Sequence, residues 1–177
     1  MGQSRRALLV AVLGLLHAGS LLAQPQDSFV VSATITEGCL VGGSVPANGA
    51  SLGTLGSLNF GIYSSLSQAT VGTSLLASST VTLSCTPGIA LSMSINGGQH
   101  STGTARRLRD AASGDTFAYE LFADAAAQQP IPMGQPVSVD TSSHPDDIQL
   151  PVHGRVSLPG NVSPGVYQDT LTVTLEW

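Results

Sequence analysis

The chain has 177 residues, of which 42% are hydrophobic and 10% are charged, and its formal net charge is −5 at pH 7. This hydrophobic content is too high for a disordered protein. The acidic balance and the lack of any lysine argue against a nucleic acid or an anionic membrane surface as a partner.

Residues 1–23 have the pattern of a secretory signal peptide. Arg5 and Arg6 form a basic start, residues 7–16 form an apolar core, and Ala23 is a small residue at a suitable cleavage point. The apolar run is too short to span a membrane and no later run is long enough, so we expect no membrane insertion. After cleavage the chain keeps four arginines and all 11 acidic residues, which gives a net charge of −7.

Residues 28–37 carry the clearest strand pattern near the start of the mature chain. Phe29, Val31, Ala33 and Ile35 are apolar, and the positions between them are hydroxylic except for Val30. A period of two places successive side chains on opposite faces of a strand, so one face is apolar and the other is polar. The pattern predicts a half-buried strand, but it leaves open whether that strand packs on its own domain or on another chain.

Cys39 and Cys85 are the two cysteines of the chain. In a secreted protein a single pair predicts one disulfide, and the spacing of a Cys-x-x-Cys redox or metal site is missing. Closing so long a loop stabilises the fold by roughly 4 kcal/mol in the chain-entropy model. Cys85 shares one face of an alternating segment with Val81 and Leu83, so we expect the disulfide to be buried.

Further strands are predicted along the rest of the chain. They cover residues 55–61, 80–86, 89–95, 116–123, 137–139, 148–158 and 167–177. The Thr-Pro-Gly turn at 86–88 predicts that the segments on either side of it are neighbouring antiparallel strands. Pro151 indicates an edge strand or a bulge. Residues 64–78 are predicted to be irregular and 99–115 to be a loop or a frayed pair, while the last strand turns Leu171, Val173, Leu175 and Trp177 inward.

Seven or eight short strands, no helix and no internal repeat predict an all-β protein. Strands of this length, separated by Gly, Pro and Asn turns, are typical of an Ig-like β-sandwich. A β-barrel is the alternative architecture.

The sequence contains no pattern of catalysis, so we expect no enzyme, metal or cofactor. Glycine-rich phosphate loops, nucleophile elbows and zinc-protease motifs are all missing. His144, Asp146 and Asp147 offer metal-binding side chains, but without a second ligand cluster they indicate an exposed polar loop. His153 and Arg155 are interpreted as surface residues of a strand. The Arg106, Arg107 and Arg109 cluster is interpreted as a solvated turn.

Six motifs, in order along the chain, resemble one known family. They are Leu58-Asn59-Phe60-Gly61, residues 79–88 around Cys85, Ile95-Asn96-Gly97-Gly98, residues 119–124, residues 152–156 and residues 164–174. Together with the cysteine pair they make the chain similar to the spore coat protein U domain, the subunit domain of archaic (Csu-type) chaperone–usher pili. One departure is Pro132-Met133-Gly134, which stands in a loop where the family often has a tryptophan.

The resemblance implies an Ig-like domain at residues 38–177 that lacks its own last strand. Residues 24–37 are then a donor strand for the neighbouring subunit, through Phe29, Val31, Ala33 and Ile35. The accepting groove is bordered by Leu171, Val173, Leu175 and Trp177. The implied partners are a periplasmic chaperone, an outer-membrane usher and other pilus subunits. The implied location is a surface pilus that supports adhesion and biofilm formation.

Two other interpretations stay open at this point. The chain is alternatively a secreted structural protein of a spore-coat-like layer, or a monomeric β-sandwich that acts as a binding module. A tip adhesin of the family would carry an extra domain and lack a donor segment, whereas this chain has one domain and a donor-like strand.

Overall fold

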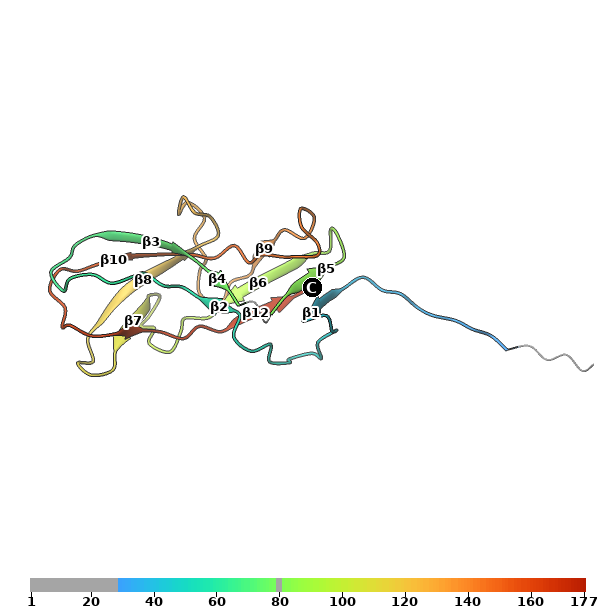
Figure 1. Cartoon of the computed structure of the whole chain (residues 1–177), viewed down its shortest axis with the longest axis horizontal. Helices are drawn as coiled ribbons and strands as arrows, with labels where there is room; N and C mark the ends of the chain where they lie inside the picture. Colours follow the sequence, from blue (N-terminus) through green and yellow to red (C-terminus); the bar gives the residue numbers. More distant parts are fainter. Residues whose placement is uncertain (1–28, 79–80) are drawn as a thin grey trace, which may run out of the picture. The chain divides into compact units, whose positions relative to one another are not determined.

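The computed structural model describes residues 29–78 and 81–177. The predicted signal peptide and the first residues of the predicted donor segment lie outside this part of the chain. The chain divides into a leading segment up to Thr34 and a compact unit from Ile35 to Trp177, which contains all the strands described below (Figure 1). Among the described residues, none forms a helix of the length and apolarity that crossing a membrane requires.

The strands of the compact unit form two main antiparallel sheets and two short strand pairs. The larger sheet has the order β11 (Tyr167–Gln168), β7 (Arg106–Asp110), β8 (Thr116–Phe122), β10 (His153–Ser157) and β3 (Thr70–Ser74). The second sheet has the order β12 (Val173–Glu176), β6 (Leu91–Ile95) and β9 (Val137–Val139). The strand pairs are β1 (Cys39–Val41) with β5 (Leu83–Cys85), and β2 (Gly56–Ser57) with β4 (Leu76–Ala77).

One buried cluster of apolar side chains joins the sheets. Leu91, Met93 and Ile95 from β6 belong to the same cluster as Leu121 from β8 and Val156 from β10. These residues occupy alternate positions of their strands, as the period of two predicts. The sheets therefore pack face to face, and the predicted all-β sandwich is confirmed.

The predicted hairpin across residues 86–88 is wrong. Strand β5 pairs with β1, whereas β6 pairs with β9 and β12. The turn between β5 and β6 therefore passes from one sheet to another. Both strands carry alternating apolar residues in either arrangement, so the pattern and the turn do not distinguish a hairpin from a connection between layers.

Four further predictions of irregular or continuous structure need correction. Residues 64–78 contain β3 and β4, and residues 99–115 contain β7. Strands β3 and β7 were not predicted because they consist mainly of Thr, Ser, Gly and Arg, so apolar and polar residues do not alternate along them. The predicted strand 167–177 is divided into β11 in the larger sheet and β12 in the smaller one. The predicted strand 148–158 is also shorter than expected. Its regular part is β10, which begins at His153, two residues after Pro151.

Arg106 is buried rather than part of a solvated turn, since only 4% of it is exposed. Its guanidinium donates to the carbonyls of Ile131 at 2.7 Å, Asn96 at 2.9 Å and Ile95 at 2.9 Å. Burial lowers its pKa. Because Arg106 lies in β7 while Ile95 ends β6, this one side chain ties the two main sheets together. Arg109 is exposed, as predicted, and Arg107 is half-buried. Both lie in β7, so the prediction of a turn is wrong for the whole cluster.

Replacing Arg106 by Met should destabilise the domain strongly. The substitution keeps most of the apolar stem but leaves buried carbonyls without a donor, at about 1–3 kcal/mol for each. We expect a loss of at least ~3 kcal/mol in the free energy of unfolding, measured by urea denaturation followed by circular dichroism. Arg109→Met, on the same strand, is the control. Equal stability of the two variants would contradict this role of Arg106.

Candidate functional site

Strand β12 is the edge strand of the smaller sheet. Just before it, the N–H of Asn96 donates to the carbonyl of Thr172 over 3.1 Å, so this rung of the ladder is hydrogen-bonded. Bonded and non-bonded pairs alternate along antiparallel strands. From the register with β6, the backbone groups of Thr174 and Glu176 therefore face β6.

The backbone groups of Val173 and Leu175 point the other way, toward the free edge. No second strand pairs with β12 among the described residues. Each of these two residues thus presents one N–H and one C=O outward. Such an edge is a template for pairing with another strand.

Strand β1 is the second edge near this site, and its position is fixed by the predicted disulfide. Cys39 and Cys85 are opposite each other in the β1–β5 pair, joined by the disulfide, and both are buried. This confirms the predicted pairing. Gly38 continues the ladder, because its carbonyl accepts from the N–H of Thr86 at 2.9 Å.

The outward groups of β1 are largely occupied by the chain itself. Val41 exchanges two backbone hydrogen bonds with Ser44, at 2.9 and 3.2 Å. Gly42 and Gly43 between them have φ of 58° and 76°, the left-handed conformation that a two-residue type I′ turn requires. The two edges are therefore unequal, because β12 is open over its length while β1 is open only around Cys39.

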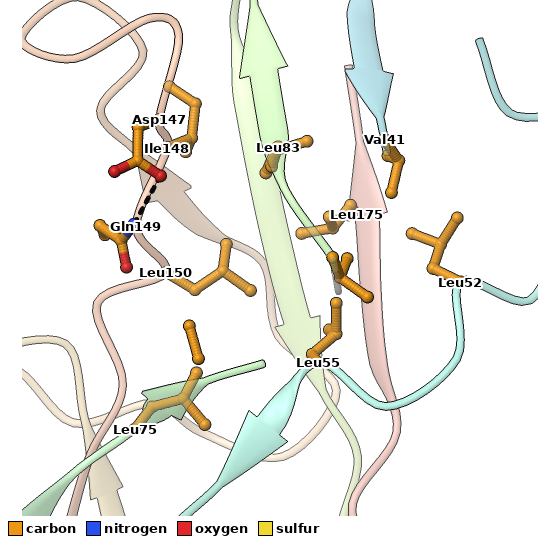
Figure 2. Close-up of a pocket in the computed structure, with 12 residues that line it drawn as sticks. Val41, Leu52, Leu55, Leu75, Leu83, Asp147, Ile148, Gln149, Leu150 and Leu175 are labelled. Carbon is orange, nitrogen blue, oxygen red and sulfur yellow. Dashed lines mark hydrogen bonds between the residues drawn. The ribbon is translucent and has the colours of Figure 1, made fainter. Parts of the chain in front are cut away.

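A hollow lined largely by apolar side chains lies beside β1 and β12 (Figure 2). Its volume is about 50 Å³, and Figure 2 shows Val41 of β1 and Leu175 of β12 on the same side of it. Leu52, Leu55, Leu75, Leu83, Ile148 and Leu150 line it further. At its rim, Gln149 Nε2 donates to Asp147 Oδ1 at 2.8 Å. Aliphatic side chains make up most of the lining and suit apolar side chains rather than water, while Asp147 and Gln149 form its polar part.

The sequence predicted inward-facing positions for some of these residues but not their meeting point. Leu83 and Ile148 fell on the apolar faces of their predicted strands. Alternation gives the face of a side chain and not the identity of the neighbouring strand. The contribution of Val41 to the hollow was therefore missed.

The predicted groove residues of the last strand are only partly covered. Leu171, Val173 and Leu175 are half-buried and pack against the core cluster. Trp177 is 44% exposed. Its indole Nε1 lies 3.8 Å from the place where Gly38 would carry a Cβ, so the ends of β12 and β1 meet here. Partly exposed apolar side chains along an open edge leave area for a further strand to cover.

The predicted donor residues are exposed in the single chain. Phe29 is 86% exposed, Val31 83% and Ile35 94%, and Ala33 is also exposed. Residues 29–38 belong to no strand. An extended segment becomes a strand only when it finds a ladder partner, so its role as a donor stays a prediction.

Candidate metal and catalytic residues do not assemble into a site. The described part of the chain has no group of three or more His, Cys, Asp or Glu side chains that would hold a metal ion. His144 and Asp146 are exposed. His153 Nδ1 lies 2.8 Å from Ser74 Oγ, and Arg155 pairs with Glu120 at 2.9 Å. These contacts join neighbouring strands at the sheet surface.

Comparison with known proteins identifies the family. The chain matches the Spore Coat Protein U domain over residues 26–174 and belongs to that family. No match was found among curated protein sequences.

Two solved structures are similar to the chain. The first is the CsuC–CsuE chaperone–tip adhesion subunit pre-assembly complex from archaic chaperone–usher Csu pili of Acinetobacter baumannii. The TM-score is 0.46 at 20% identity, over 81% of this chain and 40% of that chain. The second is a chaperone–tip adhesin complex of CFA/I fimbriae, with a TM-score of 0.34 at 14% identity, over 60% of this chain and 33% of that chain.

Because β12 pairs on one side only among the described residues, we predict that its backbone amides differ in their rates of hydrogen exchange. In the isolated monomeric chain, the amides of Thr174 and Glu176 should exchange slowly because they bond to β6. The amides of Val173 and Leu175 should exchange rapidly because they face the free edge. Residue-resolved hydrogen exchange by NMR measures the difference. Equal protection of all four amides would show that the edge is covered in the monomer.

Proposed function

We propose that this chain is a structural subunit of a surface pilus assembled by the chaperone–usher pathway. Residues 1–23 direct it to the periplasm, where a chaperone covers the β12 edge. At the outer-membrane usher, residues 24–37 of the next subunit replace the chaperone in the groove of domain 38–177. The observation that carries the proposal is the open edge of Val173 and Leu175 beside an apolar hollow. The resulting fibre supports adhesion and biofilm formation.

Strand addition to this edge gains free energy from two sources, backbone hydrogen bonds and the burial of apolar side chains. The outward groups of Val173 and Leu175 allow four hydrogen bonds at about 0.5–1.5 kcal/mol each. On the donor side, Phe29, Val31 and Ile35 each gain about 1.5–3 kcal/mol when fully buried, and Ala33 gains less. These side chains are exposed in the single chain, so nearly all of that burial is available on docking. Together, the hydrogen bonds and the buried side chains have to offset the entropy lost when the donor segment becomes ordered and the two subunits associate.

The course of the chain at Gly38 favours donation to a neighbour. The N–H of Gly38 donates to Thr86 Oγ1 at 3.1 Å, and its carbonyl accepts from the Thr86 N–H at 2.9 Å. These bonds hold Gly38 in line with β1. Residues 29–37 before it belong to no strand, so their backbone groups are available to a neighbouring subunit.

The alternation of the donor segment provides a matched pair of variants. Val31→Asp places a carboxylate on the face that enters the groove, where an unpaired charge is costly. Val30→Asp makes the same change on the opposite face, which stays in solvent. We expect cells that express chaperone and usher to form normal pili with Val30→Asp and none with Val31→Asp, as seen by electron microscopy.

Deletion of residues 26–37 should act like Val31→Asp, because a subunit without a donor segment accepts but does not donate. Periplasmic levels of each variant, measured by immunoblot, control for folding and export. Fibres of normal length from the deletion variant would refute donor-strand assembly.

A further inference from the structure

A partly buried polar contact lies where the chain crosses from the larger sheet to the smaller one. The crossing, residues 169–172, joins β11 to β12. The Tyr119 hydroxyl in β8 donates to Asp169 Oδ2 at 2.7 Å, and the N–H of Gln99 donates to Asp169 Oδ1 at 2.8 Å. Burial and the neighbouring carboxylate raise the pKa of Tyr119, so its hydroxyl remains a donor. Asp169 is thus held from β8 on one side and from the segment after β6 on the other.

A second contact fixes the first rung of the β12–β6 ladder. The side-chain Oδ1 of Asn96 accepts from the N–H of Thr172 at 2.9 Å. In a regular ladder the carbonyl of Asn96 would accept this bond, but that carbonyl accepts from Arg106 Nε at 2.9 Å. Asn96 therefore connects the start of β12, through its side chain, with Arg106, through its backbone carbonyl.

Close packing at Gly98 completes this arrangement. Gly98 has φ of 85°, and its N–H donates to Asn96 Oδ1 at 3.0 Å. A Cβ at this position would overlap the Asp169 carboxylate. The motif Ile95-Asn96-Gly97-Gly98 and the residues around Tyr119 and Asp169 were separate features of the sequence. In the fold they meet at one point, directly before the accepting edge.

We propose that Asn96, Arg106, Tyr119 and Asp169, the crossing cluster, set the position of β12 for an incoming strand. The inference rests on the proposed function. Ladder bonds form only within a narrow range of donor–acceptor distances, about 2.7–3.2 Å. A small shift of β12 therefore weakens several intermolecular bonds together. The β6 ladder and the half-buried Leu171, Val173 and Leu175 keep β12 attached. Arg106 is needed for folding as well, whereas the Tyr119–Asp169 contact affects strand acceptance more than folding.

Two tyrosines of the larger sheet allow a matched test. Tyr119→Phe removes the hydroxyl bonded to Asp169. Tyr167→Phe makes the same change in β11, where the hydroxyl donates to the Ser163 carbonyl at 2.9 Å, outside the crossing cluster. Both are made in the mature full chain carrying Val31→Asp, which does not donate to itself. The probe is a labelled synthetic peptide of residues 26–37, and binding and dissociation are followed by fluorescence anisotropy.

We expect Tyr119→Phe to weaken peptide affinity about tenfold, equal to ~1.4 kcal/mol, mainly through faster dissociation. Tyr167→Phe should change peptide affinity by less than about threefold. Its melting temperature should shift by about as much as that of Tyr119→Phe. Asp169→Asn, an isosteric change in the same cluster, should weaken binding in the same direction. It supplies the test if Tyr119→Phe folds poorly.

Two results would overturn the inference, and they are distinguishable. If the parent chain binds the peptide and both tyrosine variants lose affinity only in proportion to their melting temperatures, the cluster is structural and does not position β12 for acceptance. If the parent chain does not bind the peptide, the proposed function fails, and this inference fails with it.

Discussion

The structure depends on one open interaction, the outward backbone groups of β12, with which no second strand pairs among the described residues. Val173 and Leu175 present N–H and C=O groups at a free edge, and the adjoining hollow is apolar. Water satisfies the backbone groups of an exposed edge but gains nothing from the aliphatic lining. A strand with alternating apolar side chains satisfies both at once. The same chain carries such a segment at residues 28–37.

Much of the remaining fold serves to keep this edge open and in place. The Cys39–Cys85 disulfide fixes β1 against β5. The Gly42-Gly43 turn occupies the outward groups of Val41, so most of the open ladder positions near the hollow belong to β12. Arg106 joins β7 to the end of β6, the strand that carries β12. In the proposed assembly the groove is thus one-sided, and we infer that polar contacts at the crossing between the sheets set its geometry.

The sequence predicted the parts of the fold in which one face is apolar. Alternation identified β6, β8, β12 and their buried faces, and the cysteine pair identified the disulfide. It failed where strands are polar, because β3 is made of Thr, Gly, Ser and a single Val, and β7 is rich in arginine. It also failed on pairing, since alternation gives a face and not a neighbour. Alternation gave Leu175 its inward face, and the family resemblance implied the groove. The contributions of Val41, Asn96 and Arg106 depend on contacts between distant segments, which alternation does not predict.

Mixing two complementary variants tests the central account most directly. Mature chains with Val31→Asp should accept but not donate, and chains with Leu175→Asp should donate but not accept. Each variant is unfolded and refolded alone, and then both together, and the species are identified by native mass spectrometry. The account predicts monomers from each variant alone, and a dimer with one copy of each variant from the mixture. A mixture that stays monomeric, or oligomers from either variant alone, would contradict it.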